Sequence, residues 1–402
     1  MQRILALMSL GLGTILINPL QMASSQVAQV SPQPPQLSPP LKLVDIGTQC
    51  TPQRTCLGWD EQLFLSRGGD RQGLLRSIDN SLLYLKTDKA IATYRNYPIK
   101  EITLERVRRS LQRFRRLVAT AKLPAQLQAA VRREFAFYKS VGDDNQGTVK
   151  FTAYYAPIYQ ASRVRTAQYK YPIYRVPPNF DQWTKPHPKR IDLEGVDGLL
   201  GDKSQLRGLE MFWLRDRFQA YMIHIQGSAK LKLTDGTQTS VGFIRGTDYP
   251  WTGVGRLLFQ DGKLSKEELN MPGIIRYFRK NPQSMNNYLP RWERFIFFRE
   301  TNGEPAIGSI GVPLVPERSI ATDKSLMPPG ALAVINATFP YPGHNKKLVN
   351  RRVSRFVLDQ DTGSAIKGSG RVDYFLGYGD LAGDRAGITV TNGSIYYLLL
   401  KE

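Results

Sequence analysis

The chain has 402 residues, of which 41% are hydrophobic, so it is long enough for two domains with cores of their own and too apolar for a disordered protein. Its 55 Lys and Arg residues outnumber 34 Asp and Glu residues and give a net charge of +21, so the surface should attract polyanions such as nucleic acid, anionic membrane or acidic cell wall. The 34 glycines and 26 prolines, with aromatic residues at 10%, favour a β-rich fold with many turns.

The N-terminal segment has the pattern of a secretory signal peptide. Arg3 precedes an apolar run over residues 4–20, small residues follow it, and no charge appears before Lys42. Glycine and proline interrupt the run, which falls short of the roughly 20 clean apolar residues of a membrane span. We therefore predict a signal peptide at 1–25 and an exported, soluble protein of the periplasm or cell wall, with retention as an anchor as the alternative. No cysteine lies near the end of the run, so we expect no lipid-modified N-terminus.

The next features are a proline-rich segment and the two cysteines. Residues 26–42 are rich in Pro, Gln and Ser, which is typical of an extended linker. Cys50 and Cys56 are candidates for a small disulfide loop, because paired cysteines are typical of exported proteins. With three scattered histidines, the sequence has no zinc-ligand spacing, and we expect neither a metal nor another cofactor.

The residues from Lys42 to about Tyr138 are expected to be mostly helical. Apolar residues recur at helical spacing in three segments: Leu74–Leu85, the arginine-rich 104–117, and 124–135 behind Pro124. The arginines of the second segment, which include Arg106, are expected to form the solvated face of an amphipathic helix.

From Gly147 onward the pattern changes to short β-type runs separated by Gly, Pro, Asn and Asp. The clearest runs are Thr148–Tyr155, Ala220–Gln226, Phe295–Phe298 and Ala331–Ile335. The fold class is therefore predicted to be mainly β with N-terminal helices.

Three aspartates stand in distinctive settings near the C-terminus: Asp323 after Ser-Ile-Ala-Thr, Asp361 in Asp-Thr-Gly-Ser, and Asp373 in Gly-Arg-Val-Asp-Tyr-Phe. Glycines crowd the same region, which is typical of tight turns or closely crossing strands of a small barrel. Taken alone, an aspartate in such a loop caps backbone N–H groups or forms a turn as readily as it performs chemistry.

Together with other segments, these aspartates resemble the membrane-bound lytic transglycosylase A (MltA) family. The segments that carry the resemblance follow one order along the chain: Phe151-Thr-Ala-Tyr-Tyr-Ala-Pro157, Tyr171-Pro-Ile-Tyr-Arg-Val-Pro-Pro178, His224-Ile-Gln-Gly-Ser228, Ile307-Gly-Ser-Ile-Gly-Val-Pro-Leu-Val-Pro316 and Ser319-Ile-Ala-Thr-Asp323. The chain differs from the family at Ala153, where Gly is usual, and in lacking a lipoprotein cysteine.

The resemblance implies a double-psi β-barrel with an inserted second β-domain and a groove between the two. The barrel would consist of residues 43–161 and 291–402, with the three-aspartate segment at about 319–400, and the insert of residues 162–290. It also implies that Asp373 is the catalytic residue and that Asp361, Asp323 and Thr152 support it. The implied substrate groove contains Tyr154, Tyr155, Gln226, Gly227 and Ser228.

The implied reaction cleaves the β-1,4 bond between N-acetylmuramic acid and N-acetylglucosamine in peptidoglycan. One aspartate would act as acid and then as base while the muramic acid 6-hydroxyl closes a 1,6-anhydro ring, with exo and endo action both open. Asp373 would need a raised pKa, because an aspartate of pKa about 3.9 is protonated to only roughly one part in a thousand at pH 7. The expected partners are glycan strands, not nucleic acid, and the expected state is a monomer.

Three alternatives remain open at this point. Asp361-Thr-Gly matches the active-site motif of aspartic peptidases, which place two such aspartates together. A non-catalytic wall-binding or wall-loosening module would have the same fold, because fold does not fix function. Nucleic-acid binding would follow from charge alone, although the chain has no recognisable module for it.

Overall fold

The structure is a computed structural model that describes residues 39–46, 56–66, 69–345 and 347–402. The predicted signal peptide, nearly all of the predicted linker and Cys50 lie outside the described residues. Cys56 is disulfide-bonded. Among the described residues, no helix is both long and apolar enough to cross a membrane.

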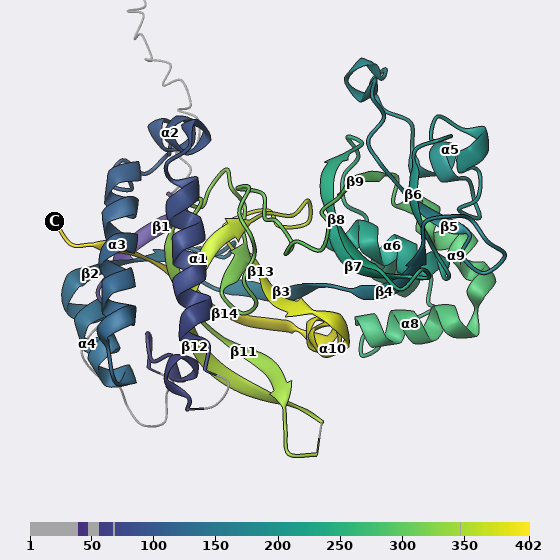
Figure 1. Cartoon of the computed structure of the whole chain (residues 1–402). Helices are drawn as coiled ribbons and strands as arrows, with labels where there is room; N and C mark the ends of the chain where they lie inside the picture. Colours follow the sequence, from purple (N-terminus) through teal and green to yellow (C-terminus); the bar gives the residue numbers. More distant parts are fainter. Residues whose placement is uncertain (1–38, 47–55, 67–68, 346) are drawn as a thin grey trace, which may run out of the picture. The chain divides into compact units, whose positions relative to one another are not determined.

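Six strands form a closed barrel (Figure 1). Their order around the barrel is β14 (Val390–Leu400), β11 (Leu332–Pro342), β12 (Leu348–Asp361), β10 (Ser319–Ala321), β13 (Arg371–Tyr378) and β3 (Val149–Ala156), which pairs again with β14. The pairings β3–β13 and β10–β12 are parallel and the other four are antiparallel. β2 (Phe135–Ser140) and β1 (Leu41–Val44) extend the sheet from β14.

Four helices precede the barrel strands: α1 (Arg71–Tyr84), α2 (Asp88–Arg95), α3 (Leu104–Thr120) and α4 (Pro124–Glu134). Their starts follow local rules, since the Thr87 and Thr103 hydroxyls accept hydrogen bonds from backbone N–H groups of α2 and α3, and Pro124 occupies the first turn of α4. The apolar face of α3 packs into the barrel core, with the Phe114 and Phe356 rings 4.8 Å apart. α10 (Gly379–Ile388) connects β13 to β14.

The second sheet has the order β5 (Tyr171–Tyr174), β6 (Glu210–Leu214), β4 (Ile158–Ser162), β7 (Ser228–Leu233), β8 (Gln238–Gly246) and β9 (Ile296–Glu300). Its helices are α5 (Arg190–Glu194), α6 (Arg217–Gln226), α7 (Val254–Gln260), α8 (Met271–Lys280) and α9 (Met285–Tyr288). Short 3-10 helices occur at Glu61–Phe64, Phe180–Gln182, Gly201–Lys203, Pro282–Ser284 and Leu289–Arg291. Sheet and helices share a hydrophobic core of their own.

The predicted fold class, mainly β with N-terminal helices, a barrel and a second β-domain, is confirmed. The three predicted helices form, and the runs at 148–155, 295–298 and 331–335 lie in β3, β9 and β11, to within a residue or two at their ends. The second sheet begins at Ile158 and ends at Glu300, four residues before and ten residues after the limits of 162 and 290 predicted for the insert.

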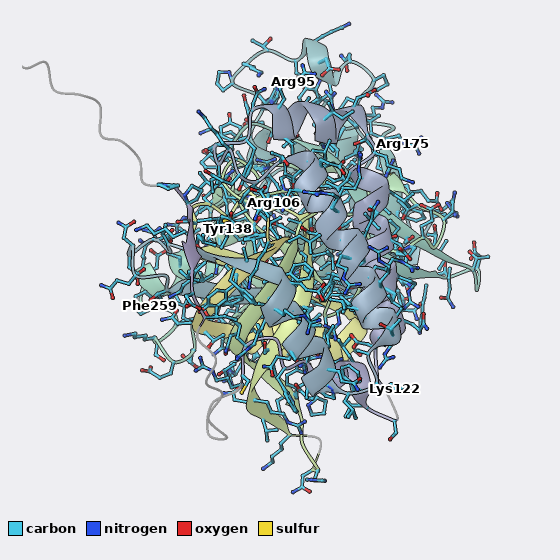
Figure 2. All side chains as sticks on the ribbon, turned by 90° about the vertical axis from the view of Figure 1, so that its left-hand side faces the viewer. Arg95, Arg106, Lys122, Tyr138, Arg175 and Phe259 are labelled. Atoms are coloured by element: carbon cyan, nitrogen blue, oxygen red, sulfur yellow. The ribbon has the colours of Figure 1, made fainter. Side chains whose placement is uncertain are left out.

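Three local predictions were wrong. Residues 220–226 are helical rather than extended: Asp216 caps the start of α6, and Gly227 ends the helix at φ 74°. The sequence did not reveal this helix, because most of its residues are buried and apolar residues therefore do not recur at helical spacing. Phe135 starts β2 instead of ending a helix. Arg106 is buried rather than solvated: its guanidinium faces Tyr138 (Figure 2) and donates to the Tyr138 hydroxyl and to the Leu400 carbonyl.

The fully buried Arg318, just before β10, joins three distant parts of the chain. Its Nε and Nη2 donate to the Asp70 carboxylate, each at 2.6 Å, and Nη1 donates to Asp60 and, at 2.9 Å, to the Phe356 carbonyl. Asp60 is also fully buried, and a second cation, Arg355, lies 3.3 Å from its Oδ1. Arg318 thereby connects the segment before α1 to strands β10 and β12.

We expect Arg318→Met to lower the free energy of unfolding by about 3–5 kcal/mol, because it removes the cation that lies closest to the buried Asp60 carboxylate and also pairs with Asp70. Arg115→Ala is the matched control: its ion pair with Asp79 is more than 40% exposed on both sides, and its loss should cost less than about 1 kcal/mol. Urea unfolding of the two variants measures both values. Equal costs would contradict the role given to Arg318.

Candidate active site

Strand register brings one row of side chains together across the barrel. Asp361 of β12 pairs with Ala321 of β10, Ala321 pairs with Asp373 of β13, and Asp373 pairs with Thr152 of β3. Residues paired across neighbouring strands point to the same face of a sheet. Four positions spread over more than 200 residues of sequence therefore meet on one face.

Asp373 has one firm partner. The Thr152 hydroxyl donates to Oδ1 of Asp373 at 2.6 Å, and within the described part of the chain no other group donates to this carboxylate. The side chain retains partial exposure. Burial raises the pKa of Asp373 to about 6 and the nearby Asp361 acts in the same direction, while the Thr152 hydrogen bond and the Arg371 charge oppose them. The second oxygen is left available to exchange a proton.

Asp361 is held by three donors. The Tyr154 hydroxyl donates to Oδ2 at 2.7 Å, and the backbone N–H groups of Ser309 and Thr362 donate to Oδ1, each at 2.9 Å. Burial raises its pKa, and the Tyr154 hydrogen bond and the two N–H groups oppose that rise. Asp361 thus fixes the loop at Ser309 and the Tyr154 side chain, and both of its oxygens are occupied.

Asp323 lies two residues beyond Ala321 and holds another loop. The Ser325 hydroxyl and backbone N–H donate to its Oδ1 at 2.6 and 3.1 Å, and the Gly368 N–H donates to Oδ2 at 3.0 Å. Burial acts to raise the pKa of Asp323, but these hydrogen bonds outweigh it and the pKa is lowered. Asp323 therefore remains ionised at neutral pH and cannot serve as an acid there.

The other residues predicted for the groove lie on three elements, β3, α6 and β7. The Tyr154 ring packs against Phe375 with the ring centres 5.2 Å apart, and its hydroxyl donates to Asp361. Gln226, at the end of α6, accepts a hydrogen bond from the Tyr155 backbone N–H at 3.1 Å. Gly227 ends α6 in the left-handed conformation, and Ser228 begins β7.

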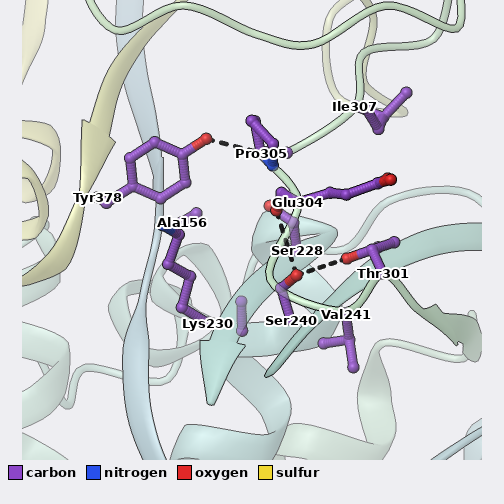
Figure 3. A pocket seen from close by; sticks show the side chains of 13 residues that line it. Ala156, Ser228, Lys230, Ser240, Val241, Thr301, Glu304, Pro305, Ile307 and Tyr378 are labelled. Carbon is purple, nitrogen blue, oxygen red and sulfur yellow. Dashed lines mark hydrogen bonds between the residues drawn. The ribbon is translucent and has the colours of Figure 1, made fainter. Parts of the chain in front are cut away.

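Ser228 also lines a small pocket (Figure 3). The pocket contains hydroxyl groups that the sequence did not single out. The Ser240 and Thr301 hydroxyl oxygens lie 2.7 Å apart, and the Tyr378 hydroxyl oxygen accepts a hydrogen bond from the Ala306 N–H at 3.0 Å. The Lys230 ammonium lies 4.6 Å from the centre of the Tyr378 ring. No local pattern marks these residues, because distant segments contribute them. Among the described residues, no cluster of His, Cys, Asp and Glu could hold a metal ion.

The chain matches two family models. Residues 150–299 match the MltA specific insert domain, and residues 318–399 match the 3D domain. The two matched regions contain the barrel strands that carry the aspartate row and the whole second sheet. They place the protein in the class that combines an MltA insert domain with a 3D domain.

Similar proteins give the same assignment. The membrane-bound lytic murein transglycosylase A of Escherichia coli K12 is 30% identical over 259 residues, which cover 64% of this chain and 67% of that protein. The corresponding protein of Vibrio cholerae is 26% identical over 270 residues, 65% and 68% of the two chains. The chain belongs to the membrane-bound lytic murein transglycosylase A family.

Solved structures share the fold. A membrane-bound lytic murein transglycosylase of Agrobacterium tumefaciens has a TM-score of 0.66 at 26% identity and covers 82% of this chain and 93% of its own. The MltA of E. coli with bound chitohexaose has a TM-score of 0.67 at 24% identity and covers 90% and 95%.

The pKa of Asp373 makes a prediction about stability. Between pH 4 and 6 the folded carboxyl binds more protons than an unfolded one of pKa about 3.9, so its contribution to stability falls as pH rises through this window. Asp373→Asn should therefore be more stable than the wild type at pH 8, by on the order of 2 kcal/mol, and no more stable below pH 4. Urea unfolding at pH 4, 6 and 8 measures the difference.

Asp144→Asn provides a control of opposite sign. The Thr148 side chain, as the main cause, lowers the pKa of this exposed aspartate to about 2. Its substitution should destabilise the protein at neutral pH, with an effect that disappears in acid. An Asp373→Asn variant that is less stable than the wild type at pH 8 would contradict a raised pKa.

Proposed function

We propose that this protein cleaves the glycan strands of peptidoglycan as a lytic transglycosylase. The bond would be the β-1,4 bond between N-acetylmuramic acid and N-acetylglucosamine, and the product would carry a 1,6-anhydromuramic acid end. Membership of the family and the names of its relatives support the substrate class. The observation that carries the proposal is the single carboxyl, Asp373, that combines a pKa of about 6 with an oxygen free of protein donors in the described structure.

A site with one available carboxyl group is better suited to the transglycosylase reaction than to hydrolysis. Most glycoside hydrolases use two carboxyl groups, one as acid and one as base or nucleophile. Here Asp361 already accepts three hydrogen bonds and Asp323 is held as an ionised loop anchor. A reaction whose nucleophile belongs to the substrate needs no second carboxyl.

The proposed steps conserve protons. Protonated Asp373 gives its proton to the glycosidic oxygen as the bond to C1 of the muramic acid breaks. The resulting carboxylate removes the proton from the 6-hydroxyl of the same sugar, whose oxygen attacks C1 and closes the anhydro ring. Asp373 ends the cycle protonated, and no water is consumed.

The surrounding residues would tune this carboxyl. Thr152 holds Oδ1 and so orients Oδ2, while Asp361 contributes a negative charge that favours the protonated form. The net charge of +21 suits a substrate that carries lactate and peptide carboxylates. We propose that the protein acts as an exported monomer in the periplasm or cell wall.

The geometry disfavours the aspartic peptidase alternative. Such enzymes need two aspartates that share one proton. In Asp361-Thr-Gly the carboxylate accepts hydrogen bonds from a tyrosine and two backbone N–H groups, and these leave no oxygen for a partner aspartate.

The main test uses mass spectrometry of muropeptides released from purified peptidoglycan. The wild type should release products lighter by one water than hydrolytic ones, and Asp373→Asn should lower the rate by at least about a thousandfold because it removes the proton donor and acceptor. Retained binding of glycan strands by the variant serves as the control. Reducing-end products would indicate a hydrolase, and an active Asp373→Asn would sink the assignment.

The pH dependence gives a second test. Because the reaction begins with protonated Asp373, kcat/KM should fall about tenfold per pH unit above pH 6. Thr152→Val removes a hydrogen bond that favours the ionised form, so the midpoint should move to higher pH, whereas Thr152→Ser keeps the hydroxyl and should leave it unchanged. A midpoint that moves down in Thr152→Val would contradict the role of Asp373.

A further inference from the structure

A second polar pocket lies in the other domain, on one face of helix α6. The helix begins at Arg217 and places Tyr221 and His224 on its following turns. Together with Arg190, Glu194 and Gly198, these three side chains line a small hollow. The aspartates of the barrel do not line it.

The pocket contains buried donors without acceptors. Nη1 of Arg217 donates to Asn286 at 2.6 Å, but Nε and Nη2 have no hydrogen-bond partner within the described part of the chain, and neither does the Tyr221 hydroxyl. Arg217 is 7% exposed and Tyr221 is 3% exposed, so bulk water does not satisfy these groups. An unsatisfied buried donor costs about 1–3 kcal/mol, and more when it is charged.

Arg190, the neighbouring guanidinium, is in contrast well satisfied. It donates to the carbonyls of Trp292 and Arg294 and to Glu194, and its Nη2 lies 3.2 Å from Nδ1 of His224. Arg190 therefore contributes positive charge to the pocket while it has little hydrogen-bonding capacity left. The unused donors belong to Arg217 and Tyr221.

The charges that line the pocket do not balance. Two guanidinium groups face one carboxylate, that of Glu194, and Asp197 nearby is exposed to solvent. Burial, and after it the charge of Arg190, lowers the pKa of His224 well below its usual range, so the imidazole is neutral. The two guanidinium groups and the one carboxylate together are therefore short of one negative charge.

The unused donors have a specific geometry. Nε and Nη2 form one edge of the planar guanidinium group, and this edge presents two parallel N–H bonds that match the two oxygens of a carboxylate. Beside this edge lies Gly198, where a Cβ atom would stand 2.9 Å from Nε. A side chain at position 198 would therefore crowd this edge of Arg217.

We propose that this pocket binds one carboxylate group, held by the Nε and Nη2 edge of Arg217 and by the Tyr221 hydroxyl. The carboxylate supplies both the missing acceptors and the missing negative charge. It belongs either to a free small acid or to the C-terminus of a peptide, and the chemistry of recognition is the same for both. The proposal is independent of the reaction at Asp373.

The test uses the full mature protein and sodium acetate as the probe. Acetate should raise the Tm in a saturable manner, whereas acetamide, which has the same shape and no charge, and sodium chloride at equal ionic strength should not. Equal shifts with acetate and chloride would overturn the assignment to a carboxylate. A crystal grown in acetate that holds only water against Arg217 would overturn it as well.

Two variants test the residues. Arg217→Lys keeps the charge but loses the two-pronged edge, so acetate affinity measured by calorimetry should fall about tenfold or more. Tyr221→Phe removes a hydroxyl that makes no hydrogen bond in the described structure, so it should weaken acetate binding several-fold without lowering the Tm of the acetate-free protein. Unchanged affinity in Arg217→Lys would contradict the proposal.

A comparison of N-acetyl-D-alanine with its amide separates the two sources of the carboxylate. Tighter binding of N-acetyl-D-alanine than of acetate, with no binding of the amide, identifies a peptide C-terminus, and equal binding identifies a free small acid. Both results support a carboxylate site. Binding of the amide as tightly as the acid would refute it.

Discussion

The register of the closed barrel is the constraint on which the candidate active site depends. Backbone hydrogen bonds between β12, β10, β13 and β3 align Asp361, Ala321, Asp373 and Thr152 in one row. A slip of one residue in any of these pairings would turn the side chains of that strand to the other face. Closure through the β3–β14 pairing restricts such slips, because each strand is bonded on both sides. The barrel therefore holds the Thr152 hydroxyl against the Asp373 carboxylate without help from flexible loops.

The three aspartates show how hydrogen bonding and burial give chemically identical carboxyl groups different pKa values. Asp323 and Asp361 each accept three hydrogen bonds and hold loops in place, whereas Asp373 accepts one from Thr152. The pKa of Asp323 is lowered by its donors, and that of Asp373 is raised to about 6 by burial. One environment produces a structural anion and the other produces an acid that titrates near the physiological range.

The buried guanidinium groups also differ in how many hydrogen-bond acceptors the protein offers them. Arg318 donates to two carboxylates and a carbonyl, and its hydrogen bonds join the segment before α1 to strands β10 and β12. Arg190 is satisfied mainly by carbonyls and Glu194. Arg217 differs from both, because its Nε and Nη2 edge faces a pocket instead of an acceptor of the described chain. A buried cation that the protein itself satisfies supports the fold, and one that the protein leaves unsatisfied points to a ligand.

The sequence by itself determined the features that depend on neighbouring residues. Apolar residues at helical spacing, with Pro124 before the last segment, predicted α1, α3 and α4, and the motifs around Asp323, Asp361 and Asp373 identified the family and its three carboxyls. Only the tertiary structure decided that residues 217–226 form a helix, that Arg106 is buried, and which aspartate keeps a free oxygen. The reason is physical: the contact between Thr152 and Asp373 joins residues 221 positions apart, and strand pairing around the barrel, not local propensity, sets it.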